Sequence, residues 1–163
     1  MFYCSATLAT AKAEALSTLA PDHSKLLTAS EWSPSRPLTL LNLFDLPKPP
    51  SFWFGDRNDR DRVRFLKAFI ESISQPVTHD GREHIDYVPS QIVTEYFRHV
   101  YRTEEGKQID GIMFPSARIK KGRNVVIFAS SDDLKPTVER MYSDAIPLLI
   151  LDSSSVRRLR LRR

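Results

Sequence analysis

Apolar residues recur at spacings of three and four in two stretches of the chain, and this spacing predicts amphipathic helices. In the first stretch Val63, Leu66 and Ile70 follow this spacing, which predicts a helix over residues 61–74. The same spacing, after a proline that suits a first helical turn, predicts a helix over residues 87–101.

The first part of the chain carries a third helix signal, of a different kind. Alanine, leucine, lysine and glutamate dominate residues 7–19, and these are strong helix formers. Thr7 or Thr10 supplies the side-chain oxygen expected of an N-cap. A weaker helix is expected over residues 131–142.

Short apolar runs bounded by polar or proline residues predict strands. They cover residues 2–4, 25–32, 38–44, 109–114, 124–129, 146–151 and 156–161. A proline-rich and aromatic loop is expected over residues 47–55, and a polar turn between the fourth and fifth of these runs. This mixture of helices and non-repeating strands predicts an α+β fold.

The composition is that of a globular protein. The chain has 163 residues, of which 41% are hydrophobic and 27% charged, so residues 1–163 are expected to form a single domain. No apolar run has the roughly 20 residues that a membrane helix needs. Cys4 is the single cysteine, which excludes an internal disulfide and favours a cytoplasmic location.

The net charge of +4 comes from the end of the chain, because five arginines lie in its last seven residues. Residues 152–163 are therefore expected to be a basic strand or tail. Arginine alternates with leucine there, which favours an edge strand with one solvated face over a phosphate-binding segment. Nucleic-acid binding is the less favoured interpretation, and it predicts salt-sensitive binding that is lost when residues 156–163 are deleted.

Several familiar chemistries have no support in the sequence. The histidines match no zinc-ligand spacing, so no metal site is expected; they are His23, His79, His84 and His99. Cys4 lies in an apolar run without a nearby histidine, which favours a buried small residue over a nucleophile. With 5 glycines, the chain has no glycine-rich nucleotide loop.

Two polar residues stand out by their position. Glu14 lies among small and apolar residues of the first predicted helix, and Ser116 follows the end of a predicted strand. A loop after a strand is a common place for a functional group. Taken alone, Glu14 is more often an exposed helix residue, and Ser116 is more often a turn or capping residue.

Three segments together resemble the RES domain family, which is named for an arginine, a glutamate and a serine. They are residues 2–14 (FYCSATLATAKAE), residues 86–96 (DYVPSQIVTEY), and residues 110–118 (DGIMFPSAR) with 122–128 (GRNVVIF). Their order along the chain is that of the family, and the resemblance extends from about residue 2 to residue 129.

The resemblance implies a fold similar to that of ADP-ribosyltransferases, with two small sheets flanked by helices around a cleft for NAD. It also implies an NAD-consuming activity without a metal, as a glycohydrolase or phosphorylase that releases nicotinamide. Most such domains are toxins of toxin–antitoxin pairs, so an Xre-type antitoxin protein is the implied partner.

The family's functional positions match Glu14, Ser116 and, for the tyrosine often found in the site, Tyr3. The family's arginine lies upstream of that tyrosine, outside this sequence. The sequence is therefore expected to be either a fragment of a longer protein or a degenerate copy with impaired NAD binding. Arg118 is the candidate to replace the missing arginine as a ligand of the NAD pyrophosphate.

Two alternative functions fit the same resemblance. One is mono-ADP-ribosyl transfer from NAD to a protein. The other is a non-catalytic interaction module derived from the same fold, which the missing arginine favours. NAD binding separates these two alternatives, because the transferase requires NAD to bind and the interaction module does not.

Overall fold

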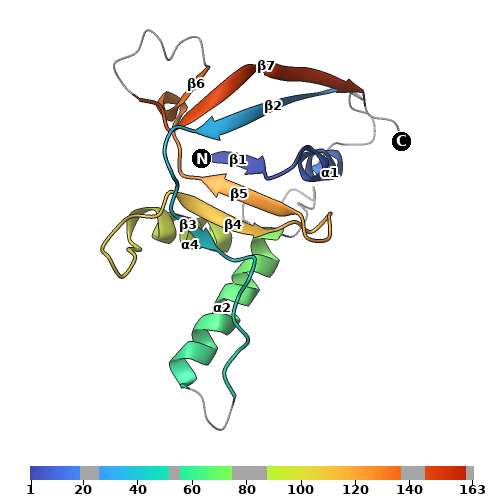
Figure 1. Ribbon diagram of the computed structural model, residues 1–163. Helices are drawn as coiled ribbons and strands as arrows, with labels where there is room; N and C mark the ends of the chain where they lie inside the picture. Colours follow the sequence, from blue (N-terminus) through green and yellow to red (C-terminus); the bar gives the residue numbers. More distant parts are fainter. Residues whose placement is uncertain (19–25, 52–55, 75–87, 137–145, 161–163) are drawn as a thin grey trace.

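The computed structural model describes residues 1–18, 26–51, 56–74, 88–136 and 146–160 (Figure 1). Within these residues the chain forms two small mixed sheets and three α-helices, which is an α+β fold as predicted. None of the helices in this part of the chain is long and apolar enough to cross a membrane.

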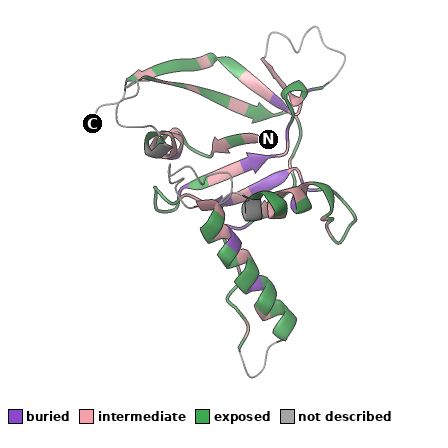
Figure 2. Ribbon diagram, turned by 180° about the vertical axis from the view of Figure 1, so that it is seen from behind, coloured by how far each residue is buried: buried purple, intermediate pink, exposed green. Residues whose placement is uncertain are grey.

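The larger sheet has four strands in the order β1-β5-β4-β3. The strands are β1 (Phe2–Ser5), β3 (Leu40–Asn42), β4 (Gly111–Pro115) and β5 (Arg123–Ile127). β5 lies antiparallel to both β1 and β4, and β3 completes the sheet parallel to β4. β4 and β5 are the most buried strands, as Figure 2 shows, because their apolar residues pack into the hydrophobic cores.

The smaller sheet has three strands in the order β2-β7-β6. β2 (Leu26–Pro34) runs antiparallel to β7 (Leu149–Arg160), and β6 (Leu134–Pro136) runs parallel to the start of β7. Beyond its first residues β7 is largely exposed, and Arg157 pairs there with Glu31 of β2 at 3.1 Å. The basic residues from 152 to 160 therefore belong to a strand.

The helices are α1 (Leu8–Thr18), α2 (Arg57–Ser74) and α4 (Val88–His99). α1 follows β1 directly and packs against β1 and β5, while one end of α2 lies beside β4 and its other end points away (Figure 1). Phe69 of α2 and Phe97 of α4 join Ile112, Phe114 and Val126 in the larger hydrophobic core. The expected cap of the first helix is confirmed, since the backbone N–H of Thr10 donates to Thr7 Oγ1 at 3.2 Å.

Most predicted elements are confirmed, with shifted ends, but two predictions were wrong. The strand expected over residues 38–44 is confirmed but shortened to β3. The described part of the helix expected over 131–142 is a short 3₁₀ turn (Ser131–Asp133) followed by β6. The strands expected over 146–151 and 156–161 form one strand, β7, because β2 pairs with it on both sides of the intervening serines, where the register shifts at a bulge. Residues 137–142 of the helix expected over 131–142 lie outside the described residues.

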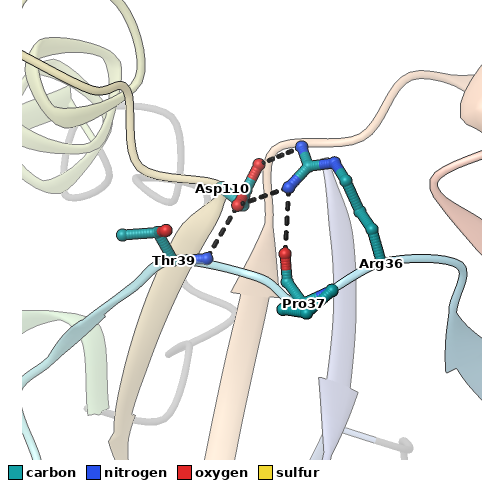
Figure 3. Close-up of polar contacts among 4 residues, drawn as sticks. All are labelled: Arg36, Pro37, Thr39 and Asp110. Carbon is teal, nitrogen blue, oxygen red and sulfur yellow. Dashed lines mark hydrogen bonds and ion pairs between the residues drawn. The ribbon is translucent and has the colours of Figure 1, made fainter.

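A charged clamp ties the segment that links the two sheets to the start of β4 (Figure 3). The Arg36 guanidinium donates to both carboxylate oxygens of Asp110, at 2.6 and 3.1 Å, and to the Pro37 carbonyl at 3.1 Å. The backbone N–H of Thr39 donates to Asp110 Oδ2 at 2.7 Å, and the Asp110 N–H donates to the Thr39 carbonyl at 2.7 Å. The clamp thereby fixes where the chain crosses from β2 to β3.

The clamp also sets the protonation of Asp110. Burial by itself would raise the pKa of this carboxyl, but the hydrogen bonds from Arg36 and Thr39 outweigh burial and leave the pKa below its ordinary value. A carboxyl whose pKa is lowered by folding stabilises the fold above its ordinary pKa, and this stabilisation disappears as the pH falls through the lowered value.

The turn between β4 and β5 is tightly closed. Ser116 N–H donates to the Gly122 carbonyl at 2.8 Å, and Gly122 N–H donates to the Ile119 carbonyl at 2.8 Å. A Cβ atom at Gly122 would lie 2.9 Å from the Ile119 carbonyl oxygen and 3.0 Å from the Cβ of Ser116. The turn therefore requires glycine at this position for close backbone approach.

We expect Asp110→Asn to lower the free energy of unfolding by about 1 kcal/mol at pH 7, because the amide keeps the shape but loses the charge of the clamp. The difference from the wild type should begin to shrink below about pH 4, where the carboxyl of the unfolded chain takes up its proton, and should disappear as the pH falls through the lowered pKa of the folded state. Urea unfolding over this pH range measures it. Asp45→Asn, at an exposed aspartate, is the matched control. A difference that does not change with pH would contradict the charge-based explanation.

We expect Gly122→Ala to destabilise the chain by roughly 1–3 kcal/mol, because the added methyl group collides with the turn. Thermal or urea unfolding measures the loss. Gly106→Ala tests a glycine with open space but a positive φ of 75°, so it reports backbone strain without collision. Full stability of the Gly122→Ala variant would show that the turn opens without cost.

Candidate functional site

Folding brings Glu14 and Ser116 into direct contact. The Ser116 hydroxyl donates to Glu14 Oε1 at 2.6 Å, although the two residues are 102 positions apart. Glu14 comes from α1, which packs against β1 and β5, and Ser116 begins the turn after β4. Both side chains are half-buried, so the carboxylate is shielded by the protein without being sealed from solvent.

The hydroxyl of Ser116 makes three hydrogen bonds. Its oxygen accepts from the backbone N–H groups of Arg118 and Ile119, at 3.1 and 3.0 Å, while its hydrogen is directed to Glu14. A serine hydroxyl has one hydrogen to donate. In this arrangement Ser116 orients the carboxylate, and donation to a ligand would require that hydrogen to be redirected.

Asn124 of β5 is a third member of the site, which the sequence analysis did not single out. Its Nδ2 donates to Glu14 Oε1 at 2.8 Å, and its Oδ1 accepts from Ser5 Oγ, also at 2.8 Å. Ser5 and Asn124 are directly opposite each other in the β1–β5 pair. The available signal was a polar residue at the start of an apolar strand, which is too common to distinguish a site residue.

Tyr3 and Arg118 differ in how they relate to this network: Tyr3 shares a strand face with Ser5, and Arg118 contacts Ser116 through its backbone. Tyr3 precedes Ser5 by two residues on β1, so both side chains leave the strand on the same face, about 7 Å apart along it. Its side chain is 70% exposed. Arg118 takes part through its backbone N–H, and its side chain is exposed on the turn.

A separate hollow of about 600 Å³ lies at the opposite end of β4 and β5. Its lining includes Arg36 and Asp110 of the clamp, Arg98 and His99 at the end of α4, and Phe128 just after β5. The length of β4 separates it from Ser116, about 15 Å at the usual rise of a strand. The hollow therefore does not contain Glu14, and the hydrogen-bonded network defines the candidate site.

Metal and thiol chemistry have little basis in the described part of the chain. No group of three or more histidine, cysteine, aspartate or glutamate side chains comes together there to hold a metal ion. His99 is bonded to Glu95 at 3.0 Å, while His23, His79 and His84 lie outside the described residues. Cys4 packs against the smaller core, and burial raises the pKa of its thiol, which disfavours the reactive thiolate.

Comparisons with known proteins identify the family of the chain. The family model of the RES domain matches residues 1–149, which include β1, α1, β4, β5 and all four residues of the network. No curated protein and no solved structure gives a significant match. Because the family model matches most of the chain, the protein belongs to the RES domain family.

Proposed function

We propose that this chain is an NAD-consuming enzyme of the RES type, a glycohydrolase or phosphorylase that releases nicotinamide. The observation that carries the proposal is the 2.6 Å hydrogen bond between Ser116 and Glu14, which joins two residues that the family resemblance singled out independently. The two small sheets with α1 beside them support the ADP-ribosyltransferase-like architecture that the proposal requires.

The reaction breaks the bond between the nicotinamide nitrogen and the ribose, and nicotinamide leaves as a neutral molecule. Positive charge then develops on the ribose, as in glycoside cleavage. A fixed carboxylate beside the anomeric carbon stabilises that charge. We assign this role to Glu14. Water as acceptor gives ADP-ribose and a proton, whereas phosphate gives the phosphorylated ADP-ribose.

The neighbouring residues have supporting roles in this proposal. Ser116 holds the carboxylate in one orientation, which lowers the cost of reorganisation during the reaction. Tyr3 offers an aromatic ring and a hydroxyl to the ligand from the face of β1 that also carries Ser5. Arg118 is the proposed partner of the pyrophosphate, since a guanidinium binds phosphate oxygens in pairs.

Membership of the family suggests a biological role for the chain. We propose that the chain is the toxin of a toxin–antitoxin pair, acting in the cytoplasm, with an Xre-type protein as its antitoxin. In this proposal the antitoxin stops NAD consumption by blocking or distorting the partly buried carboxylate network.

We expect Glu14→Gln to lower nicotinamide release from NAD by at least about 100-fold, because the amide cannot stabilise a developing positive charge as a carboxylate does. Chromatographic detection of nicotinamide measures the loss. The control is Glu71→Gln, an exposed glutamate on α2. Equal turnover by the Glu14→Gln variant and the wild type would remove Glu14 from the mechanism.

The fate of the ADP-ribose separates the candidate reactions. With NAD labelled in its adenosine half, we expect label in free ADP-ribose or, when phosphate is added, in its phosphate ester. Label attached to a protein would instead favour the mono-ADP-ribosyltransferase. A chain that leaves labelled NAD intact, and whose thermal unfolding NAD does not shift, would be a non-catalytic interaction module.

A further inference from the structure

The amide of Asn124 lies between Ser5 and Glu14, and the two neighbours determine which way it faces. A carboxylate only accepts hydrogen bonds, so the amide must present its Nδ2 to Glu14. Its Oδ1 then faces Ser5, whose hydroxyl must be the donor. The opposite orientation of the amide would place two oxygens against each other at Glu14.

The hydrogen bonds of Asn124 and Ser116 converge on the same oxygen of Glu14 from two different parts of the fold. Asn124 is held by the backbone pairing of β5 with both of its neighbours, whereas Ser116 is held by the turn after β4. Glu14 itself is carried by α1. Donors from a sheet strand and from a turn thus hold the Glu14 side chain of α1. Two hydrogen bonds from separate parts of the fold restrict its rotamer more than a single hydrogen bond would.

We infer that Ser5 and Asn124 form a positioning pair for the reaction at Glu14. Asn124 holds the carboxylate oxygen that Ser116 also holds, and Ser5 keeps the amide of Asn124 in the orientation that can donate to it. Neither residue is assigned contact with the reacting atoms. The inference rests on the proposed NAD-consuming function and adds two residues to which the family resemblance gave no role.

A purely structural role for the pair makes a different prediction. β1 and β5 are already joined by backbone pairing from Phe2 to Ser5, so the side-chain bond between Ser5 and Asn124 lies at the end of an existing ladder. If the bond served only to join the strands, its loss would lower stability and leave the turnover of the folded enzyme unchanged. If the pair instead positions Glu14, its loss misplaces the carboxylate and lowers kcat in the folded enzyme.

The test measures nicotinamide release by purified chains carrying Asn124→Ala, Ser5→Ala or Ser5→Thr, with Asn58→Ala as the matched control. Asn58 is an exposed asparagine near the start of α2. We expect Asn124→Ala to lower kcat roughly 10- to 100-fold with little change in KM. Ser5→Ala should lower kcat less, by about 3- to 10-fold, and Ser5→Thr should retain turnover because threonine keeps the hydroxyl donor.

Asn124→Asp supplies a readout that a structural role would not change. This substitution places a second carboxylate against Glu14, and two close carboxylates restore a hydrogen bond only when they share a proton. We expect turnover of this variant to be lost at neutral pH and partly recovered as the pH falls. The wild type and the Asn58→Ala variant should not show this recovery.

The outcomes distinguish the inference from the function on which it rests. A wild-type chain that releases no nicotinamide overturns both. An active wild type, with a folded Asn124→Ala variant of equal kcat, overturns the positioning pair alone. If Asn124→Ala does not fold, the Ser5→Ala loss and the pH profile of Asn124→Asp decide the matter, and an unchanged kcat in the first with an unchanged profile in the second overturns the inference.

Discussion

The antiparallel pairing of β4 with β5 is the constraint on which both the core and the candidate site depend. Ile112 and Val126 lie opposite each other in this pair and are buried in the larger core. At one end, the tight turn carries Ser116, with Asn124 just after it. At the other end, Asp110 anchors the crossing between the two sheets. One strand pair thus joins the core, the site and the link between the sheets.

The candidate site shows how a fold with few glycines and no nucleotide loop can still hold a carboxylate firmly. The hydrogen bonds to Glu14 Oε1 come from a serine and an asparagine whose own remaining bonds are directed by backbone N–H groups and by Ser5. The hydrogen bonds of this set are directed toward Glu14 or toward a residue that orients it. Such an arrangement favours a carboxylate that keeps its position while charge develops near it.

The sequence predicted α1, α2 and α4 best, because alanine-rich composition and the spacing of apolar residues act locally. It failed where pairing across the fold decides the structure. The serines after Asp152 resemble a break between strands, but β2 pairs with β7 on both sides of them and the break is only a bulge. Glu14 and Ser116 could be joined only through their resemblance to a family, since nothing local brings together residues 102 positions apart. Asn124 was missed because its role depends on facing Ser5 across the β1–β5 pair.

The central claim is that Glu14 and Ser116 act as one unit in the consumption of NAD, and a double-mutant cycle tests it most directly. Nicotinamide release would be compared among the wild type, Glu14→Gln, Ser116→Ala and the double variant. If Ser116 acts by holding the carboxylate, its substitution lowers turnover in the wild type and adds little once Glu14 is a glutamine. Two losses that multiply in full, or a wild type without any release, would contradict this account.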